Sequence, residues 1–233
     1  MVVALLTTGC TSDTGLSGRF FRDPAPYQAE IEEGLGVSVV ILLDTSGSMN
    51  DAVPGGVQPK YRVALSAIEE MLGATDAFVE RRPEFPVRVS IYHFASGAWK
   101  IQAIADYDRA RIQRALERIP RPGGGTAIGD AMAAARPELY RGGTYRKYLI
   151  VVTDGENTTG WDPARVARRI HSKSEGAVQI YFVAFDTNPA SFSFLKEVGG
   201  DVLAAGNGAE LRSALDEIYQ GKILAEEIDA GER

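Results

Sequence analysis

Residues 39–49 read VVILLDTSGSM, and this stretch decides the fold. Its first half is uninterrupted apolar sequence, which is typical of a strand buried on both faces of a parallel sheet. The apolar run stops at Asp44, and two hydroxyl side chains, Ser46 and Ser48, follow at alternate positions. A buried strand that ends in a carboxylate and two hydroxyls predicts a polar site at the edge of the sheet.

Similar apolar runs recur along the chain, and helical patterns separate them. We predict strands at 37–44, 87–96, 98–104, 147–155, 177–185 and 201–206, and helices at 61–81, 106–119, 127–139, 163–174, 189–198 and 208–224. The third of these strands follows the second through the turn at Ser96 and Gly97, so we expect this pair to be antiparallel. The alternation predicts an α/β fold, a doubly wound and mostly parallel sheet with helices on both faces and one antiparallel edge strand.

Length and composition fit one folded domain. The chain has 233 residues, of which 45% are hydrophobic, and shows no repeat or second core pattern. We place this domain at residues 37–224. Residues 11–36 contain Gly, Ser, Pro and charges without an apolar period, which predicts a tether or irregular arm, and residues 225–233 form an acidic tail.

Charge and composition weigh against several classes of function. A net charge of −6 argues against nucleic acid or an acidic membrane as the main partner. One cysteine and two histidines leave no intrachain disulfide, no cysteine-based zinc site and little material for histidine-dependent catalysis. Outside the N-terminal stretch, no segment approaches the roughly 20 apolar residues that a membrane-spanning helix needs.

The N-terminal sequence MVVALLTTGC resembles a bacterial lipoprotein signal. A short apolar run leads to small residues and then to Cys10, which in such proteins becomes the lipidated N-terminus. The resemblance implies that residues 1–10 are a truncated signal peptide and that a lipid on Cys10 anchors the protein to a membrane of the cell envelope. The alternative is a cytoplasmic protein with an incidental free thiol at this position.

Three loops carry oxygen donors at the predicted carboxyl ends of strands or just before a helix. Asp44, Ser46 and Ser48 follow the first strand, Thr126 follows three glycines, and Asp154 follows a central strand. Ligands of doubly wound sheets gather at this edge, so we expect these side chains to face one site. Donor sets made only of oxygen select hard cations, Mg²⁺ foremost, with Mn²⁺ or Ca²⁺ as alternatives.

These residues resemble the metal-ion-dependent adhesion site of the von Willebrand factor A family. The family motif is Asp-x-Ser-x-Ser, then a distant Thr and a distant Asp, and this sequence fills it at Asp44, Ser46, Ser48, Thr126 and Asp154. The resemblance extends over about residues 37–220. It implies that Ser46 and Ser48 bind the metal directly, that Thr126 does so directly or through water, and that the two aspartates act mostly through bridging water.

The resemblance implies a metal-dependent protein-binding module rather than an enzyme. A metal surrounded by hydroxyls and water keeps most of its positive charge, and a Glu or Asp of a partner protein can supply the missing anionic ligand. Members of this family have adhesion or assembly roles at the bacterial cell envelope, and some act beside ATPases of the MoxR kind. We therefore expect a protein partner that presents an acidic side chain.

Two other functions fit parts of the pattern. A haloacid-dehalogenase-like phosphotransferase also has a nucleophilic Asp after its first strand, but its acid/base Asp would stand at Ser46, and no phosphate-clamping lysine is evident nearby. The other alternative is a structural envelope protein in which the metal only ties loops together. Asp44 and Ser46 alone could also cap a turn, although Thr126 and Asp154 favour the metal site.

Overall fold

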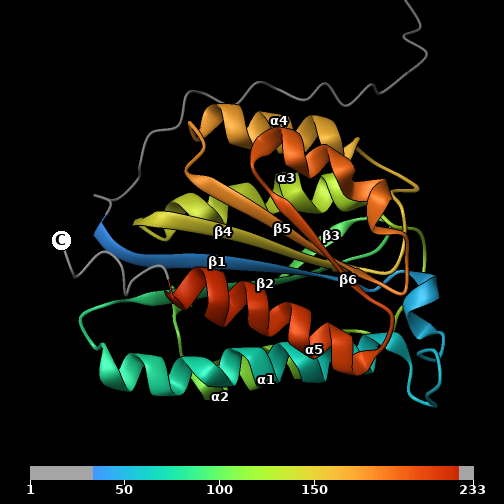
Figure 1. Ribbon diagram of the computed structural model, residues 1–233, viewed down its shortest axis with the longest axis horizontal. Coiled ribbons are helices and arrows are strands. Elements are labelled where there is room, and N and C mark those ends of the chain that lie inside the picture. Colours follow the sequence, from blue (N-terminus) through green and yellow to red (C-terminus); the bar gives the residue numbers. More distant parts are fainter. Residues whose placement is uncertain (1–33, 226–233) are drawn as a thin grey trace, which may run out of the picture.

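A six-stranded sheet lies between two layers of helices in the computed structural model, which describes residues 34–225 (Figure 1). The strands are β1 (Gly34–Asp44), β2 (Val87–Phe94), β3 (Ala98–Asp106), β4 (Thr144–Thr153), β5 (Val178–Phe185) and β6 (Asp201–Ala205). Cys10 and most of the predicted tether and acidic tail lie outside the described residues. The last tether residues, Gly34 to Gly36, belong to β1 instead, because the chain already pairs with β4 at Gly34.

The strand order is β3-β2-β1-β4-β5-β6, with β1 in the middle of the sheet. Every neighbouring pair is parallel except β2 and β3, which form the predicted antiparallel pair at one edge. The chain thus winds outward from β1 in both directions. The predicted doubly wound α/β architecture with one antiparallel edge strand is confirmed.

Helices cover both faces of this sheet. One layer holds α1 (Lys60–Arg81), α2 (Arg109–Glu117) and α5 (Gly208–Asp216), and the other holds α3 (Ile128–Arg141), α4 (Pro163–Lys173) and the 3-10 helix η2 (Pro189–Val198), as Figure 1 shows. A short 3-10 helix, η1 (Gly47–Asn50), follows β1 at the carboxyl edge of the sheet. Among the described residues, no helix combines the length and the apolar character of a membrane span.

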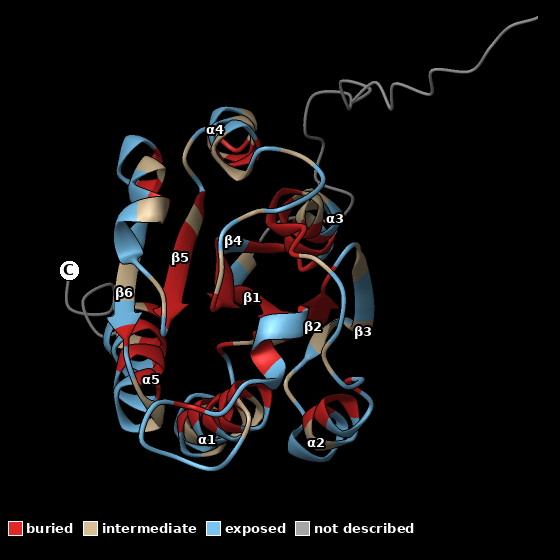
Figure 2. Ribbon diagram, turned by 90° about the vertical axis from the view of Figure 1, so that its right-hand side faces the viewer, coloured by how far each residue is buried: buried red, intermediate tan, exposed pale blue. Residues whose placement is uncertain are grey.

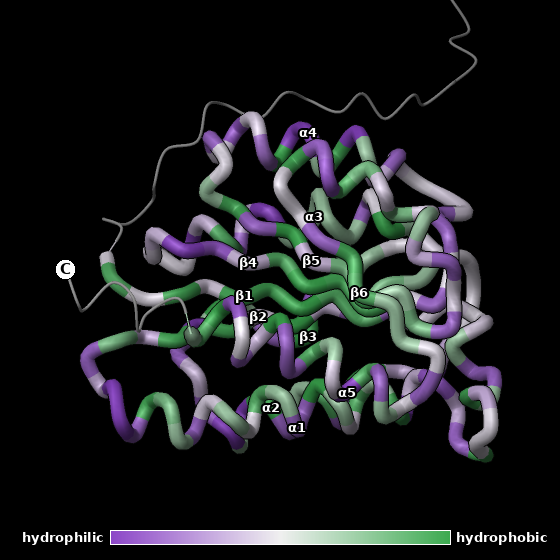
Figure 3. The backbone as a smooth tube through the Cα atoms, in the orientation of Figure 1, coloured by the Kyte–Doolittle hydropathy of each residue, from purple (hydrophilic) through white to green (hydrophobic). Residues whose placement is uncertain are grey.

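The central strands supply both halves of the core. In β1, Val39, Ile41 and Leu43 pack in the core under α1 and α5, whereas Val40 and Leu42 pack in the core under α3 and α4. All are fully buried, as expected for alternate side chains of a strand that is covered on both faces. Figure 2 shows this burial, and Figure 3 shows the matching band of hydrophobic residues along the strands.

The helix ends follow their local sequence. The Asp108 side chain accepts a hydrogen bond from the Arg111 backbone N–H, and the Asp162 side chain accepts one from the Ala164 N–H, so these two aspartates cap α2 and α4. Pro163 takes the first helical position of α4, where its missing N–H costs nothing.

The C-terminal helix differs from its prediction. We predicted one helix at 208–224, but the α-helix gives way to a π-helix, η3 (Glu217–Leu224). In η3 the pairs Ile218 and Ile223, and Tyr219 and Leu224, are five residues apart and all buried. The wider i→i+5 turn keeps these side chains on one face, which the tighter α-helical turn would not do.

A buried carboxylate joins α3 to the edge strand β3. Only 2% of the Glu138 side chain is exposed, and its Oε1 lies 3.0 Å from Lys100 Nζ and 2.8 Å from Arg141 Nη1. Its Oε2 accepts a hydrogen bond of 2.7 Å from the Ile104 backbone N–H. Burial raises the pKa of Glu138, but the hydrogen bonds from Ile104, Lys100 and Arg141 outweigh it, so the pKa lies below its usual value.

We expect the substitution Glu138→Ala to lower the free energy of unfolding by about 2 kcal/mol, because it leaves the Ile104 N–H without an acceptor and two cations without their anion. Urea unfolding at neutral pH measures this loss. Glu138→Gln keeps the shape and an acceptor, so it should lose less. Because the folded pKa is lowered, the charge contributes above pH 4.5 and fades below it, so wild type and Glu138→Gln should converge on acidification. Equal stability of wild type and Glu138→Ala would contradict the role of this carboxylate.

Candidate metal centre

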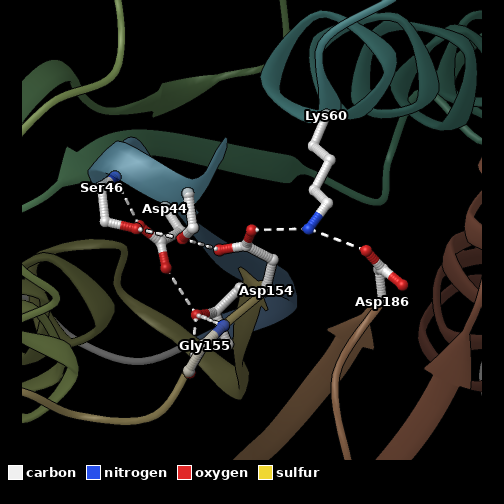
Figure 4. A network of polar contacts seen from close by, with 8 residues as sticks. Asp44, Ser46, Lys60, Asp154, Gly155 and Asp186 are labelled. Carbon is white, nitrogen blue, oxygen red and sulfur yellow. Dashed lines mark hydrogen bonds and ion pairs between the residues drawn. The ribbon is translucent and has the colours of Figure 1, made fainter. Parts of the chain in front are cut away.

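The candidate site lies where β1, β4 and the loop before α3 meet. Asp44 is the last residue of β1, and Asp154 follows the last residue of β4. The two strands are parallel neighbours, with Leu43 opposite Val152, so their carboxyl ends lie together. Figure 4 shows the two aspartates close to one another, together with Ser46.

Asp44 is fully buried and held by both carboxylate oxygens. Its Oδ1 accepts a hydrogen bond of 2.7 Å from the Ser46 backbone N–H, and its Oδ2 accepts one of 2.5 Å from Thr153 Oγ1. Burial raises the pKa of Asp44 to about 6, although the hydrogen bonds from Thr153 and Ser46 oppose this rise. The carboxylate therefore has a fixed orientation, and a cation beside it would stabilise its charged form.

The two serines connect Asp44 to Asp154. Ser46 Oγ and Ser48 Oγ are 3.3 Å apart, and Ser48 Oγ donates a hydrogen bond of 2.7 Å to Asp154 Oδ1. A serine hydroxyl that donates its hydrogen to a carboxylate still has lone pairs for a cation. This arrangement therefore turns a neutral oxygen toward the site while the charged carboxylate stays behind it.

Thr126 lies beside this group. Its residue is 5% exposed, its backbone N–H donates to Thr158 Oγ1 at 2.8 Å, and its carbonyl accepts from the Thr158 N–H at 2.9 Å. Its hydroxyl oxygen is 4.0 Å from the point where a Cβ on Gly155 would lie, so it borders the residue after Asp154. Within residues 34–225, however, no hydrogen bond joins its hydroxyl to Ser46 or Ser48.

Glycine backbone joins the two loops. The Gly47 N–H donates to the Gly124 carbonyl at 3.0 Å, and the Gly123 N–H donates to the Thr45 carbonyl at 2.8 Å. Gly124 has a φ of +84°, and a Cβ there would lie 2.7 Å from Ser96 Oγ. Only glycine fits this position without strain, which explains the second glycine of the run before Thr126.

Three further polar residues belong to the site and are not among the five predicted site residues: Thr153, Lys60 and Asp186. Lys60, the first residue of α1, places its Nζ 3.0 Å from Asp154 Oδ2 and 2.8 Å from Asp186 Oδ2 (Figure 4). A lysine therefore does lie at the site, but two aspartates hold its ammonium. Burial lowers the pKa of Lys60, but its hydrogen bonds to Asp186 and Asp154 outweigh burial and raise it, so the ammonium stays charged.

The sequence does contain a signal for two of these three residues. Asp186 directly follows β5, as Asp154 follows β4, and the carboxyl ends of both strands lie at the same edge. Lys60 begins the helix that crosses from β1 to β2, and the N-terminus of such a helix lies at that edge too. Thr153 gives no such signal, because a threonine in a buried strand reads as part of the core.

His93 and Trp99 support the Asp44 loop from its outer side. His93 is buried, and its Nδ1 lies 2.9 Å from Thr45 Oγ1, in the loop that follows Asp44. Trp99 stacks on the His93 ring at a centroid distance of 5.1 Å, yet half of its surface is exposed. Trp99 therefore packs on His93 and is open to solvent over the rest of its surface.

The donor set fits a hard divalent cation. Among the described residues, no group of three or more His, Cys, Asp or Glu side chains could hold a metal ion. The candidate site is instead built from serine and threonine hydroxyls with two aspartates behind them. Oxygen donors of this kind suit Mg²⁺, Mn²⁺ or Ca²⁺ and disfavour metals that prefer thiolate or imidazole ligands.

Solved structures show where else this fold occurs. A mutant of the PilB minor pilin from Streptococcus sanguinis superposes with a TM-score of 0.70 and 15% identity, over 87% of this chain and 65% of the pilin chain. BatB from Bacteroides thetaiotaomicron gives 0.63 and 21%, over 82% of this chain and 100% of that one. A von Willebrand factor type A protein from Catenulispora acidiphila gives 0.63 and 21%, over 80% of this chain and 42% of that one.

At these identities the likeness concerns the fold alone, and the chain spans less than two thirds of both the pilin and the Catenulispora protein. No curated protein matches the sequence. The sequence profile of the von Willebrand factor type A domain matches residues 39–156, which include all five positions of the motif. This match spans half of the chain and contains the site described above, so the chain belongs to the von Willebrand factor type A domain family.

Proposed function

We propose that this protein binds a divalent cation, Mg²⁺ foremost, and uses it to bind a carboxylate of a partner protein. The proposal rests on one observation above all. Hydroxyl and carboxylate oxygens from the segments that end β1 and β4 or directly follow them meet at the same edge of the sheet, with Ser48 donating its hydrogen to Asp154. Membership of a family whose domains are commonly metal-dependent interaction modules supports it.

In this proposal each residue has a distinct task. Ser46 and Ser48 offer neutral hydroxyl oxygens to the cation, and Thr126 completes the set directly or through water. Asp44 and Asp154 stand behind the serines and act mostly through bridging water. A bound divalent cation would supply a positive centre, open to solvent, for a Glu or Asp of the partner.

The site gives less support to phosphotransferase chemistry. Ser46 stands where such enzymes need a second carboxylate for proton transfer. Lys60 is near, but it is buried and bound to two aspartates, so it is not placed to clamp a phosphate of a substrate. A metal that only ties loops together would use the same residues. The experiments below distinguish this structural role from the binding of a partner protein.

The envelope location is part of this proposal. It depends on the resemblance of residues 1–10 to a lipoprotein signal, with Cys10 as the lipidated residue, and on the fold shared with a minor pilin. An envelope protein that presents an acidic side chain is the expected partner, and an ATPase of the MoxR kind is one candidate for the wider assembly.

The orientation of Asp44 depends on Thr153. The hydroxyl of Thr153 donates to Asp44 Oδ2 at 2.5 Å, and among the hydrogen bonds of Asp44 it has the largest effect on the pKa of this carboxylate. Groups that orient a metal site from behind typically change metal affinity by about 10–100-fold when they are removed.

For Thr153→Val we expect Mn²⁺ affinity to fall by about 10-fold or more, and the free energy of unfolding to fall by about 1–3 kcal/mol, because a buried carboxylate oxygen loses its donor. Titration calorimetry and urea unfolding measure the two effects. Thr153→Ser keeps the hydroxyl and should bind Mn²⁺ nearly as wild type does. If Thr153→Val bound Mn²⁺ with unchanged affinity, this role of Thr153 would be wrong.

The cation itself is tested with Mn²⁺, whose binding can be followed by electron paramagnetic resonance, with Mg²⁺ as competitor. Wild type should bind Mn²⁺, and saturating metal should raise the stability by about 2.7 kcal/mol at a hundredfold excess over the dissociation constant. Ser48→Ala should weaken binding at least about 10-fold. Ser66→Ala, an exposed serine on α1, is the matched control and should change nothing. Absence of Mn²⁺ binding to wild type would refute the proposal.

Docking is tested by capture from an envelope extract of the source bacterium, in Mg²⁺ or in EDTA. A true partner should be captured in Mg²⁺ by wild type and by Ser66→Ala, and lost both in EDTA and with Ser48→Ala. Replacing one Glu or Asp of that partner should abolish capture, since its carboxylate is the proposed ligand. If EDTA lowers the melting temperature but leaves every interaction intact, the metal is structural and docking is wrong.

A further inference from the structure

A buried lysine bridges two aspartates at the edge of the candidate metal site. Lys60 is 7% exposed, and its ammonium contacts Asp154 and Asp186, the residues that follow β4 and β5 (Figure 4). The Asp154 side chain is fully buried, whereas the Asp186 side chain is 34% exposed. Three separate elements thus place one positive and two negative charges within contact distance.

Asp154 belongs to both the metal site and this ion pair. Its Oδ1 accepts the hydrogen of Ser48, and its Oδ2 faces the ammonium of Lys60 at 3.0 Å. The fixed charge of Lys60 therefore acts directly on a carboxylate of the motif. Asp186 forms an ion pair with the same ammonium at 2.8 Å, so its charge affects how fully Lys60 neutralises Asp154.

We propose that Lys60 is a positioning residue that limits how tightly the site holds its divalent cation, and that Asp186 moderates this effect. The inference rests on the proposed metal binding and adds a function for two residues outside the motif. By neutralising part of the charge on Asp154, Lys60 leaves the bound cation more of its positive charge. That charge is what a carboxylate of a partner would meet.

The charge balance of the site supports this role. With Asp44, Asp154 and Asp186 ionised, the ammonium of Lys60 leaves two negative charges, which one divalent cation balances. Without Lys60, a third negative charge would remain, so the site would hold the cation more tightly. Because Lys60 and Asp154 are buried, water screens their charges less than it would at the surface.

Asp186 offers a conservative test of the same idea. Its φ is +54°, in the left-handed region that Asn and Asp tolerate better than other residues with a side chain. Asp186→Asn therefore keeps the shape and the backbone while it removes one negative charge. Lys60 would then act on Asp154 alone, and the site should hold its cation less tightly.

The test is the Mn²⁺ dissociation constant of the full chain at neutral pH and constant ionic strength. We expect Lys60→Met to bind Mn²⁺ about 10-fold more tightly than wild type, and Asp186→Asn to bind it several-fold, about 3–10-fold, more weakly. The matched controls are Lys222→Met and Asp201→Asn. These two residues form an ion pair at the start of β6, at the opposite end of the sheet, so each should change binding less than about twofold.

The two substitutions are expected to change Mn²⁺ affinity in opposite directions, and this distinguishes the proposed role from a merely structural one. If the ion pairs only supported the fold, both substitutions would loosen the site and weaken Mn²⁺ binding. Unchanged or weaker binding by Lys60→Met would therefore overturn the inference, whereas no Mn²⁺ binding by wild type would instead overturn the proposed function.

If Lys60→Met does not fold, the Mn²⁺ affinity of Asp186→Asn decides. Weaker binding with an unchanged melting temperature in EDTA supports the inference, and any other result overturns it.

Discussion

The parallel pairing of β1 with β4 is the constraint on which the site depends. It places Leu43 opposite Val152, and the next residues on the two strands, Asp44 and Thr153, are then close enough to form a buried hydrogen bond. A shift of one residue in this register would send apolar side chains of a doubly covered strand to the wrong layer. The core packing of the two strands therefore fixes the position of Asp44 within the site.

Burial of charge is the cost of this arrangement, and the structure offsets it in two ways. Hydrogen bonds from Ser46 and Thr153 satisfy Asp44, and an ammonium satisfies Asp154. Neither device removes all the negative charge, because Asp44 receives no cationic partner among the described residues. In the proposed function, this remaining charge is what would attract a divalent cation to the site.

The sequence predicted the parts of the molecule that local pattern determines. Continuous apolar runs such as that of β1 identify buried strands, and Asp108 and Asp162 identify helix starts, because these features depend on neighbouring residues only. Ser46, Ser48 and Asp154 were predicted to lie near one another because strand ends in a doubly wound sheet share an edge. The start of α1 at this edge is readable from the sequence, but the contact of Lys60 with Asp154 and Asp186 depends on the path of the loop between η1 and α1, which pattern does not reveal. The π-helical turn at Glu217 was missed because it reflects tertiary packing.

The same edge of the sheet thus holds two different kinds of hydrogen-bond donor for one carboxylate, Asp154. A lysine is covalently fixed, carries a single charge and meets Asp154 on the side of α1, whereas the hydroxyl of Ser48 meets it on the side of β1. A site that needed only rigidity would gain by neutralising all of its carboxylates internally. Under the proposed function, the negative charge that is left would be balanced by an exchangeable ion, so the charge of this surface would depend on what is bound, as a surface that recognises an acidic partner requires.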